Sequence, residues 1–126
     1  MAERQILNSL SIKQFTEFQQ TAYMPIIVKF GAPWCGPCKI IKHLCDEWFK
    51  LTPGFIYADI NIDNDIELFS ALKSKKMVKS VPTLLFYNNK VKRDYWYIPD
   101  DSVIGGDIHQ VCAFFDRCNC YFGSPN

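Results

Sequence analysis

The sequence has no excess of charge of either sign. Its 126 residues carry 14 Lys and Arg against 13 Asp and Glu, which leaves a formal net charge of +1 at neutral pH. Proteins that bind duplex nucleic acid or an anionic membrane surface need clustered basic side chains. We therefore expect neither nucleic acid nor a membrane among the partners.

Long apolar runs are lacking too. Nowhere do about 18 apolar residues follow one another, as a membrane-spanning helix would require, and residues 1–8 hold no run of signal-peptide length. We therefore expect a soluble, cytoplasmic protein. In a reducing cytosol thiols stay reduced, so a cysteine pair there is more often catalytic or metal-binding than structural.

The sequence shows no internal repeat, no low-complexity stretch and no linker. We expect a single domain over residues 1–118, followed by a short C-terminal tail over residues 119–126. A domain of this size buries about 65–70% of its unfolded surface, so its core needs no disulfide. The six cysteines therefore require another explanation.

The first half of the chain predicts a helix followed by a βαβ unit. A capping box at Ser11 begins an amphipathic helix. Residues 26–30 form a nearly unbroken apolar run, typical of a central strand covered on both faces, with Lys29 as the exception. A long amphipathic helix begins near Cys38, and residues 55–60 repeat the strand pattern, so the two strands should be parallel.

The second half predicts a helix, a hairpin and a last helix. A helix over residues 65–74 precedes an apolar strand over residues 81–87. Residues 88–89, Asn-Asn, suit a tight turn because Asn tolerates positive φ, and residues 91–97 should return as the partner strand. The last helix opens at residues 105–107. The fold class is therefore α/β, with a central mixed sheet flanked by helices on both faces.

Cys35 and Cys38 stand where the first strand of the βαβ unit gives way to its helix. At a helix start, unpaired N–H groups and the positive end of the helix dipole favour thiolate over thiol. If the pKa of such a thiol falls from about 8.5 to near 7, its thiolate fraction at neutral pH rises from roughly 3% to about half. This placement favours rapid thiol–disulfide exchange.

A Cys-x-x-Cys spacing alone has two other interpretations. Structural zinc sites use the same spacing, but they need a second pair of ligands, and the remaining Cys and His residues form no such pair. We therefore expect no metal. The pair could also be inert, because nothing in a sequence demonstrates turnover.

Three segments together resemble the thioredoxin family. Residues 30–39, Phe-Gly-Ala-Pro-Trp-Cys-Gly-Pro-Cys-Lys, are similar to the family's active-site segment. The Gly-Pro between the cysteines is typical of thioredoxins rather than of glutaredoxins or disulfide isomerases. Residues 81–83, Val-Pro-Thr, resemble the cis-proline element that faces the dithiol, and residues 61–63 resemble the end of the second parallel strand. The resemblance covers residues 6–87 and implies the thioredoxin fold.

The resemblance also implies roles for single residues. Cys35 would be the attacking thiolate and Cys38 the resolving thiol that releases the mixed disulfide. Pro82, in the cis form, would hold the Val81 backbone against the dithiol, where it can pair with a substrate chain. Trp34 would flank the site as an apolar docking surface. Two residues between the cysteines complete the predicted substrate-binding set: Gly36 and Pro37.

Two of these roles have alternatives on the residues alone. Pro82 could occupy an ordinary trans turn at the start of a strand. Trp34 could simply be packed in the core, as large aromatic side chains usually are.

The activity that the resemblance implies is thiol–disulfide oxidoreduction. The protein would act as a protein-disulfide reductase in electron transport and cell redox homeostasis, with the redox-active Cys35–Cys38 disulfide and no bound cofactor. Its partners would be disulfide-containing target proteins and a thioredoxin reductase or glutathione system. The alternative is a thioredoxin-fold interaction or scaffold subunit whose dithiol is dispensable.

Charges near the dithiol depart from the family pattern. Lys29 stands where the family commonly has a buried Asp, and Asp59 stands where many members have Lys. A buried Lys is costly unless paired, so we expect a Lys29–Asp59 ion pair, the alternative being that Lys29 reaches solvent along its apolar stem. We hypothesise that Lys29 stabilises a nearby thiolate and makes the dithiol more oxidising, while Asp59 accepts the Cys38 proton. Lys39 completes the predicted tuning set.

The passage over residues 93–106 is longer than its family counterpart, which borders the active site. Its aromatic residues could narrow the substrate range or form a homodimer surface. They could equally alternate into the core as strand residues.

The remaining cysteines fall into two groups. Cys45 and Cys112 lie on apolar helix faces and should be buried and inert. Cys118 and Cys120 lie near the chain end and are expected to be exposed. There they could bridge a homodimer, form a secondary redox couple, or be incidental surface thiols.

Overall fold

The computed structural model describes residues 6–21, 24–90 and 92–123. Five strands and four helices lie within these residues. The strands are β1 (Ile6–Leu7), β2 (Ile26–Gly31), β3 (Ile56–Asn61), β4 (Thr83–Tyr87) and β5 (Asp101–Ile104). The helices are α1 (Ile12–Thr21), α2 (Gly36–Leu51), α3 (Glu67–Ser74) and α4 (Ile108–Gly123).

The strands form one mixed sheet in the order β1-β3-β2-β4-β5. β1, β3 and β2 are parallel, whereas β4 pairs antiparallel with β2 and β5 antiparallel with β4. β2, the central strand, is buried along its whole length. This agrees with the apolar run in its sequence, and the predicted parallel βαβ unit is confirmed.

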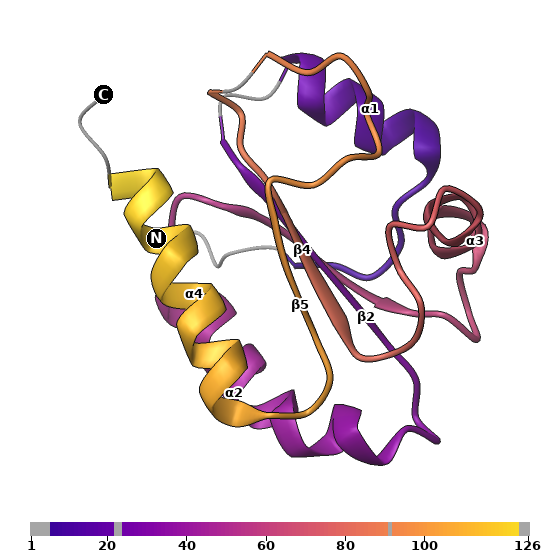
Figure 1. Cartoon of the computed structure of the whole chain (residues 1–126), viewed down its shortest axis with the longest axis vertical. Helices are drawn as coiled ribbons and strands as arrows, with labels where there is room; N and C mark the ends of the chain where they lie inside the picture. Colours follow the sequence, from indigo (N-terminus) through magenta and orange to yellow (C-terminus); the bar gives the residue numbers. More distant parts are fainter. Residues whose placement is uncertain (1–5, 22–23, 91, 124–126) are drawn as a thin grey trace.

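Helices cover both faces of the sheet (Figure 1). α1 and α3 pack on one face, over a core that includes Val28 and Phe30 of β2. α2 and α4 pack on the other face, over a core that includes Ile27. Alternate residues of β2 point to opposite faces, so Lys29 lies on the same face as Ile27. The predicted α/β class and its two helical layers are therefore confirmed.

The start of α1 confirms the predicted capping box. The Gln14 amide donates a hydrogen bond to the Ser11 hydroxyl (3.1 Å), and the Ser11 amide donates to the Gln14 side-chain oxygen (3.0 Å). Two backbone donors at the helix start are thereby satisfied. Among the residues that the structure describes, no helix has the length and apolarity needed to span a bilayer.

Two sequence predictions about the second half are wrong. Residues 92–97 are irregular rather than a strand, and β4 pairs instead with β5, which begins at Asp101. Val91, the first residue of the predicted strand, lies outside the described residues. The predicted tail begins within α4, which continues to Gly123; only residues 124–126 of it lie outside the described chain.

Candidate active site

The two cysteines of the motif lie at the N-terminus of α2, where β2 ends. Cys35 is the N-cap residue of this helix, and Pro37 stands in its first turn. The two sulfurs form a disulfide, with the Cα atoms 5.3 Å apart. The Cys38 amide donates a hydrogen bond to the Cys35 sulfur at 3.2 Å. The sulfur therefore takes the place of a capping oxygen, which favours negative charge on it once the disulfide opens.

The opposite wall of the site is the backbone before β4. The Val81–Pro82 peptide bond is cis, as predicted, and not the trans turn of the alternative. The Val81 carbonyl oxygen lies 3.7 Å from the Cys35 sulfur. Cys35, Cys38 and Ala32 form a small apolar cluster against which Val81 packs. The main chain of Val81 thus lies directly beside the sulfur assigned to attack.

Trp34 stands beside the disulfide with 66% of its surface exposed. It is therefore not packed in the core, which removes the alternative raised for it. Its indole N–H donates to both carboxylate oxygens of Asp63, at 3.2 and 3.1 Å. The sequence presents Asp63 only as part of a strand end, and its position after β3 is the signal that places it near the dithiol.

Gly106 is a site residue that sequence reasoning missed. A Cβ atom on Gly106 would lie 2.9 Å from the Cβ atom of Pro37, closer than real Cβ contacts allow. A residue without a side chain is therefore required for the β5–α4 connection to approach the Cys-Gly-Pro-Cys segment. The Gly105 amide donates to the Pro82 carbonyl at 2.9 Å and ties the same connection to the cis-proline wall.

Lys29 and Asp59 form the ion pair that the sequence predicts. They are direct partners in the parallel pairing of β2 with β3, and the Lys29 ammonium lies 3.5 Å from the Asp59 carboxylate. Only 7% of the Lys29 side chain is exposed, against 31% for Asp59. Lys29 therefore does not reach solvent along its apolar stem. Of the two side chains in the pair, Asp59 is the one that is partly exposed to solvent.

A cavity of about 480 Å³ extends from this ion pair to Cys38. Cys38, Lys29 and Asp59 all contribute to its wall, together with Lys39 of the predicted tuning set. Among the described residues, no group of three or more Cys, His, Asp and Glu side chains is arranged to hold a metal ion.

The other cysteines differ in burial. Cys45 is buried, as predicted, and burial raises the pKa of its thiol from 9.0 to about 12. Cys112 is only half-buried. Cys118 is buried rather than exposed, which corrects the prediction, and burial raises the pKa of its thiol well above 9.0. α4 continues past this position, so Cys118 faces the core while Cys120 is exposed.

The passage that follows β4 lies at the far end of the sheet from the dithiol. β4 begins beside Pro82 and ends at Tyr87, so the irregular residues 88–90 and 92–100 lie away from Cys35, next to α1 (Figure 1). Of the longer passage predicted to border the active site, only the end near residues 105–106 does so. Its aromatic residues therefore do not border the site and do not form a strand, but Trp96 and Tyr97 do pack against the core, as the second alternative expects.

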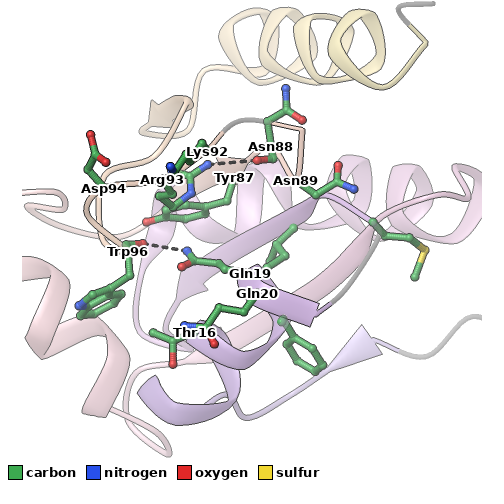
Figure 2. Close-up of a pocket in the computed structure, with 13 residues that line it drawn as sticks. Thr16, Gln19, Gln20, Tyr87, Asn88, Asn89, Lys92, Arg93, Asp94 and Trp96 are labelled. Atoms are coloured by element: carbon green, nitrogen blue, oxygen red, sulfur yellow. Dashed lines mark hydrogen bonds between the residues drawn. The ribbon is translucent and has the colours of Figure 1, made fainter. Parts of the chain in front are cut away.

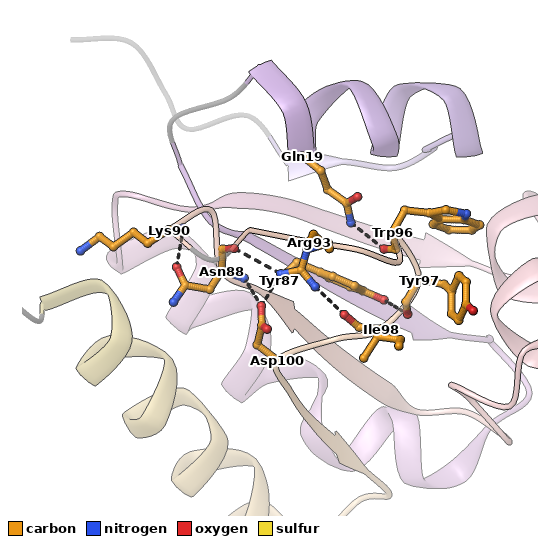
Figure 3. A network of polar contacts seen from close by, with 9 residues as sticks. All are labelled: Gln19, Tyr87, Asn88, Lys90, Arg93, Trp96, Tyr97, Ile98 and Asp100. Atoms are coloured by element: carbon orange, nitrogen blue, oxygen red, sulfur yellow. Dashed lines mark hydrogen bonds and ion pairs between the residues drawn. The ribbon is translucent and has the colours of Figure 1, made fainter. Parts of the chain in front are cut away.

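Polar contacts hold residues 88–100 in place (Figure 3). The Arg93 guanidinium donates to the backbone carbonyls of Asn88 and Ile98 and to the Asp100 carboxylate. The Tyr87 hydroxyl donates to the Tyr97 carbonyl at 3.0 Å. These contacts connect both ends of the passage, whose described residues, 88–90 and 92–100, have no regular secondary structure.

The same loop encloses a second cavity, of about 400 Å³, against α1 (Figure 2). The Gln19 side chain donates to the Trp96 carbonyl at 2.8 Å, and the Trp96 ring contacts Phe15 at 6.0 Å between centroids. Trp96 and Tyr97 are thus partly buried over α1, whereas Tyr95 is exposed.

Comparison with known proteins agrees with this geometry. The family model described as Thioredoxin matches residues 7–98. The chain is 34% identical over 104 residues to an M-type chloroplastic thioredoxin of Pisum sativum, covering 82% of this chain and 52% of that protein. It is 28% identical over 88 residues to a thioredoxin of Rickettsia felis, covering 69% of this chain and 80% of that protein. The chain spans about half the length of several of these relatives.

Solved structures show the same fold. A thioredoxin of Trypanosoma brucei brucei superposes with a TM-score of 0.67 at 21% identity, covering 93% of this chain and 93% of that one. The oxidised thioredoxin O1 of Arabidopsis thaliana superposes with a TM-score of 0.65 at 25% identity, covering 90% of this chain and 97% of that one.

Proposed function

Because this chain belongs to the thioredoxin family, we propose that it is a thiol–disulfide oxidoreductase that reduces protein disulfides through Cys35 and Cys38. The observation that carries the proposal is the position of Cys35 as the N-cap of α2, with the Cys38 amide donating to its sulfur. A thiolate held there is stabilised by a hydrogen bond and by the helix dipole.

The reaction proceeds in two exchange steps. In the reduced protein, the Cys35 thiolate attacks one sulfur of a target disulfide, forms a mixed disulfide, and expels the other target sulfur as a thiolate. Cys38 then loses its proton and attacks the Cys35 sulfur. The Cys35–Cys38 disulfide forms, the second target sulfur leaves as a thiolate, and two electrons have passed to the target.

The walls of the site supply docking for the target chain. The Val81 backbone lies beside the attacking sulfur, where an extended target segment can add main-chain hydrogen bonds. Pro82 fixes that backbone, Trp34 offers an exposed aromatic face, and the Gly36–Pro37 turn lets the target approach closely.

Lys29 and Asp59 tune the dithiol. A buried ammonium near the cavity wall that Cys38 shares favours the thiolate form of that cysteine, which makes the dithiol more oxidising. The partly exposed Asp59 carboxylate accepts the Cys38 proton through the cavity. Lys39, at the cavity rim, adds to the positive potential.

The proposal also includes the cellular compartment of the protein and the systems that reduce it again. The protein works in the cytoplasm, in electron transport and redox homeostasis, and is reduced again by a thioredoxin reductase or a glutathione system. If it self-associates, Cys120 is the exposed thiol available for a bridge, and Tyr95 is the exposed aromatic of the loop.

Covalent trapping tests the function. A Cys38→Ser variant lacks the resolving thiol, so mixed disulfides through Cys35 accumulate and genuine targets stay attached. A Cys35→Ser variant is the matched control and should trap none of them. If the Cys38→Ser variant captures no more than this control, and the Cys35→Ser, Cys38→Ser double variant keeps its cellular role, the chain is a scaffold instead.

A further inference from the structure

The backbone beside the attacking sulfur leads back along the chain to a lysine. The Val81 carbonyl oxygen lies 3.7 Å from the Cys35 sulfur, and Lys79 stands two residues before Val81. Two residues span at most about 7 Å of backbone, and a lysine side chain adds a flexible four-carbon stem. The Lys79 ammonium can therefore reach a target residue that lies next to the cysteine under attack.

Hydrogen bonds around Pro82 hold this segment in place. The hydroxyl of the buried Thr83 donates to the Ser80 carbonyl at 2.6 Å, and the Gly105 amide donates to the Pro82 carbonyl at 2.9 Å. Lys79 directly precedes Ser80 and is exposed. The backbone that carries the ammonium is therefore anchored, so the charge has a defined place beside a docked target chain.

Two exposed acidic side chains in the segments that border the dithiol are already engaged within the protein. Both carboxylate oxygens of Asp63 accept from the Trp34 indole, at 3.2 and 3.1 Å. Asp107, at the start of α4, accepts two backbone amide hydrogen bonds through one carboxylate oxygen, at 2.9 and 3.2 Å. These two carboxylates therefore position the indole and satisfy donors at the helix start.

The exposed cations in these segments have no partner within the protein. Among the residues that the structure describes, the side chains of Lys39 and Lys79 make neither a hydrogen bond nor an ion pair. Residues 68–93 contain no Asp or Glu, so no near neighbour along the chain neutralises Lys79. The positive end of the α2 dipole has the same sign. The uncompensated charge beside the dithiol is therefore positive.

From these observations we propose that Lys79 makes the protein selective for target disulfides that are flanked by an acidic residue. The inference rests on the proposed function and names its class of target. A target chain that lies along the Val81 backbone brings the residues next to its cysteine within reach of Lys79, where a carboxylate is attracted and an ammonium repelled. The exchange steps at Cys35 and Cys38 are unchanged. The attraction raises the rate at which the two reacting sulfurs meet.

Three synthetic peptides measure the selectivity. Each has a single cysteine, joined by a disulfide to a second copy of the same peptide, and the three differ only in the residues on either side of the cysteine, which are Glu, Ser or Lys. The full-length protein is reduced with dithiothreitol, freed of it, and mixed with each peptide, and a single turnover is followed by chromatography. The charge preference is the rate constant for the Glu peptide divided by that for the Lys peptide.

Variants at position 79 assign the preference to its charge. Differences in the intrinsic reactivity of the peptides cancel when two proteins are compared. At low salt, the charge preference should fall at least about threefold in Lys79→Gln, and this fall should shrink at high salt, where exposed charges are screened. Lys79→Arg should keep the preference, and Lys79→Glu should lower it further than Lys79→Gln. An equal preference in Lys79→Gln and the unmodified protein would overturn the proposal.

A control variant separates local from general charge. Lys92→Gln removes the same charge from an exposed residue after β4, at the far end of the sheet, and should leave the preference as in the unmodified protein. A fall as large as that in Lys79→Gln would overturn the assignment to Lys79. The Ser peptide separates the two proposals. If it is reduced while Lys79→Gln keeps the full charge preference, the inference fails and the proposed function stands; if no peptide is reduced, both fail.

Discussion

Lys29 and Asp59 face each other as direct partners on neighbouring parallel strands, with the ammonium 3.5 Å from the carboxylate. The pair is asymmetric, because the Lys29 side chain is buried and that of Asp59 is partly exposed. A buried charge that loses its partner is costly, whereas a partly exposed one is solvated by water. The two residues should therefore respond differently to substitution.

Stability should depend more on Asp59 than on Lys29. Asp59→Asn leaves the buried ammonium without a counter-charge and should lower the free energy of unfolding by about 2 kcal/mol. Lys29→Met fills the same space with an apolar chain and should change it by less than about 1 kcal/mol. Urea unfolding of the oxidised proteins measures both, and an equal loss in the two variants would contradict the asymmetry.

The redox potential, unlike the stability, should depend strongly on Lys29. Removing the ammonium in Lys29→Met destabilises the thiolates of the reduced form, so the potential should become more negative by roughly 10–30 mV, a change measured by redox titration against glutathione. The Lys29→Met, Asp59→Asn double variant removes both charges and should recover part of the shift. A potential that stays within error of the unmodified protein in Lys29→Met would exclude a tuning role.

Buried thiols should make the fold sensitive to alkali. Burial raises the pKa of Cys45 from 9.0 to about 12, so the unfolded chain loses this proton at lower pH than the folded chain. The stability due to this group is complete below about pH 9 and is lost as the pH rises toward 12. Urea midpoints measured from pH 8 to 11 should fall less steeply in Cys45→Ala than in the exposed-site control Cys120→Ala.

The same burial predicts the pattern of alkylation. At neutral pH in the native, oxidised protein, iodoacetamide should modify Cys120 and leave Cys45 and Cys118 untouched, because burial both covers these thiols and raises the pKa of each. Peptide mapping measures the three sites. Fast modification of Cys118 would contradict its burial in the folded protein.

The loop after β4 should depend on Arg93. Arg93→Gln removes the donor to two carbonyls and to Asp100, and should cost about 1–3 kcal/mol because the Arg93 and Asp100 side chains are largely buried. Hydrogen exchange should accelerate in residues 88–100 while the redox potential stays unchanged. Arg117→Gln breaks an exposed pair with Asp101 and should cost less than about 1 kcal/mol.

Elements of the fold that depend on a local sequence pattern could be predicted from the sequence. Apolar runs and helical periodicity located β2, α2 and β3, and the capping box located the start of α1. The prediction of a hairpin at residues 88–89 was wrong for a specific reason. The Asn-Asn pair is a strong local turn signal, but Arg93 and Asp100 join residues across the loop, and contacts of that kind have no local signature.

The candidate site was predicted where its residues lie in one motif and missed where separate loops meet. Cys35, Cys38 and Pro82 are carried by short segments that the sequence displays. Asp63 and Gly106 join the site only because the ends of β3 and β5 converge on the same edge of the sheet. Cys118 was misplaced because the last helix is longer than its pattern indicates, so its inward face extends further along the chain.

The separation between the dithiol and the loop of residues 88–100 has a practical use. A single strand, β4, joins Pro82 to Tyr87, so the two regions lie at opposite ends of one rigid element. Tyr95 is 57% exposed on that loop. A fluorophore or an immobilisation tether placed at Tyr95 therefore leaves the sulfur chemistry free, which makes this position suitable for single-molecule or sensor formats.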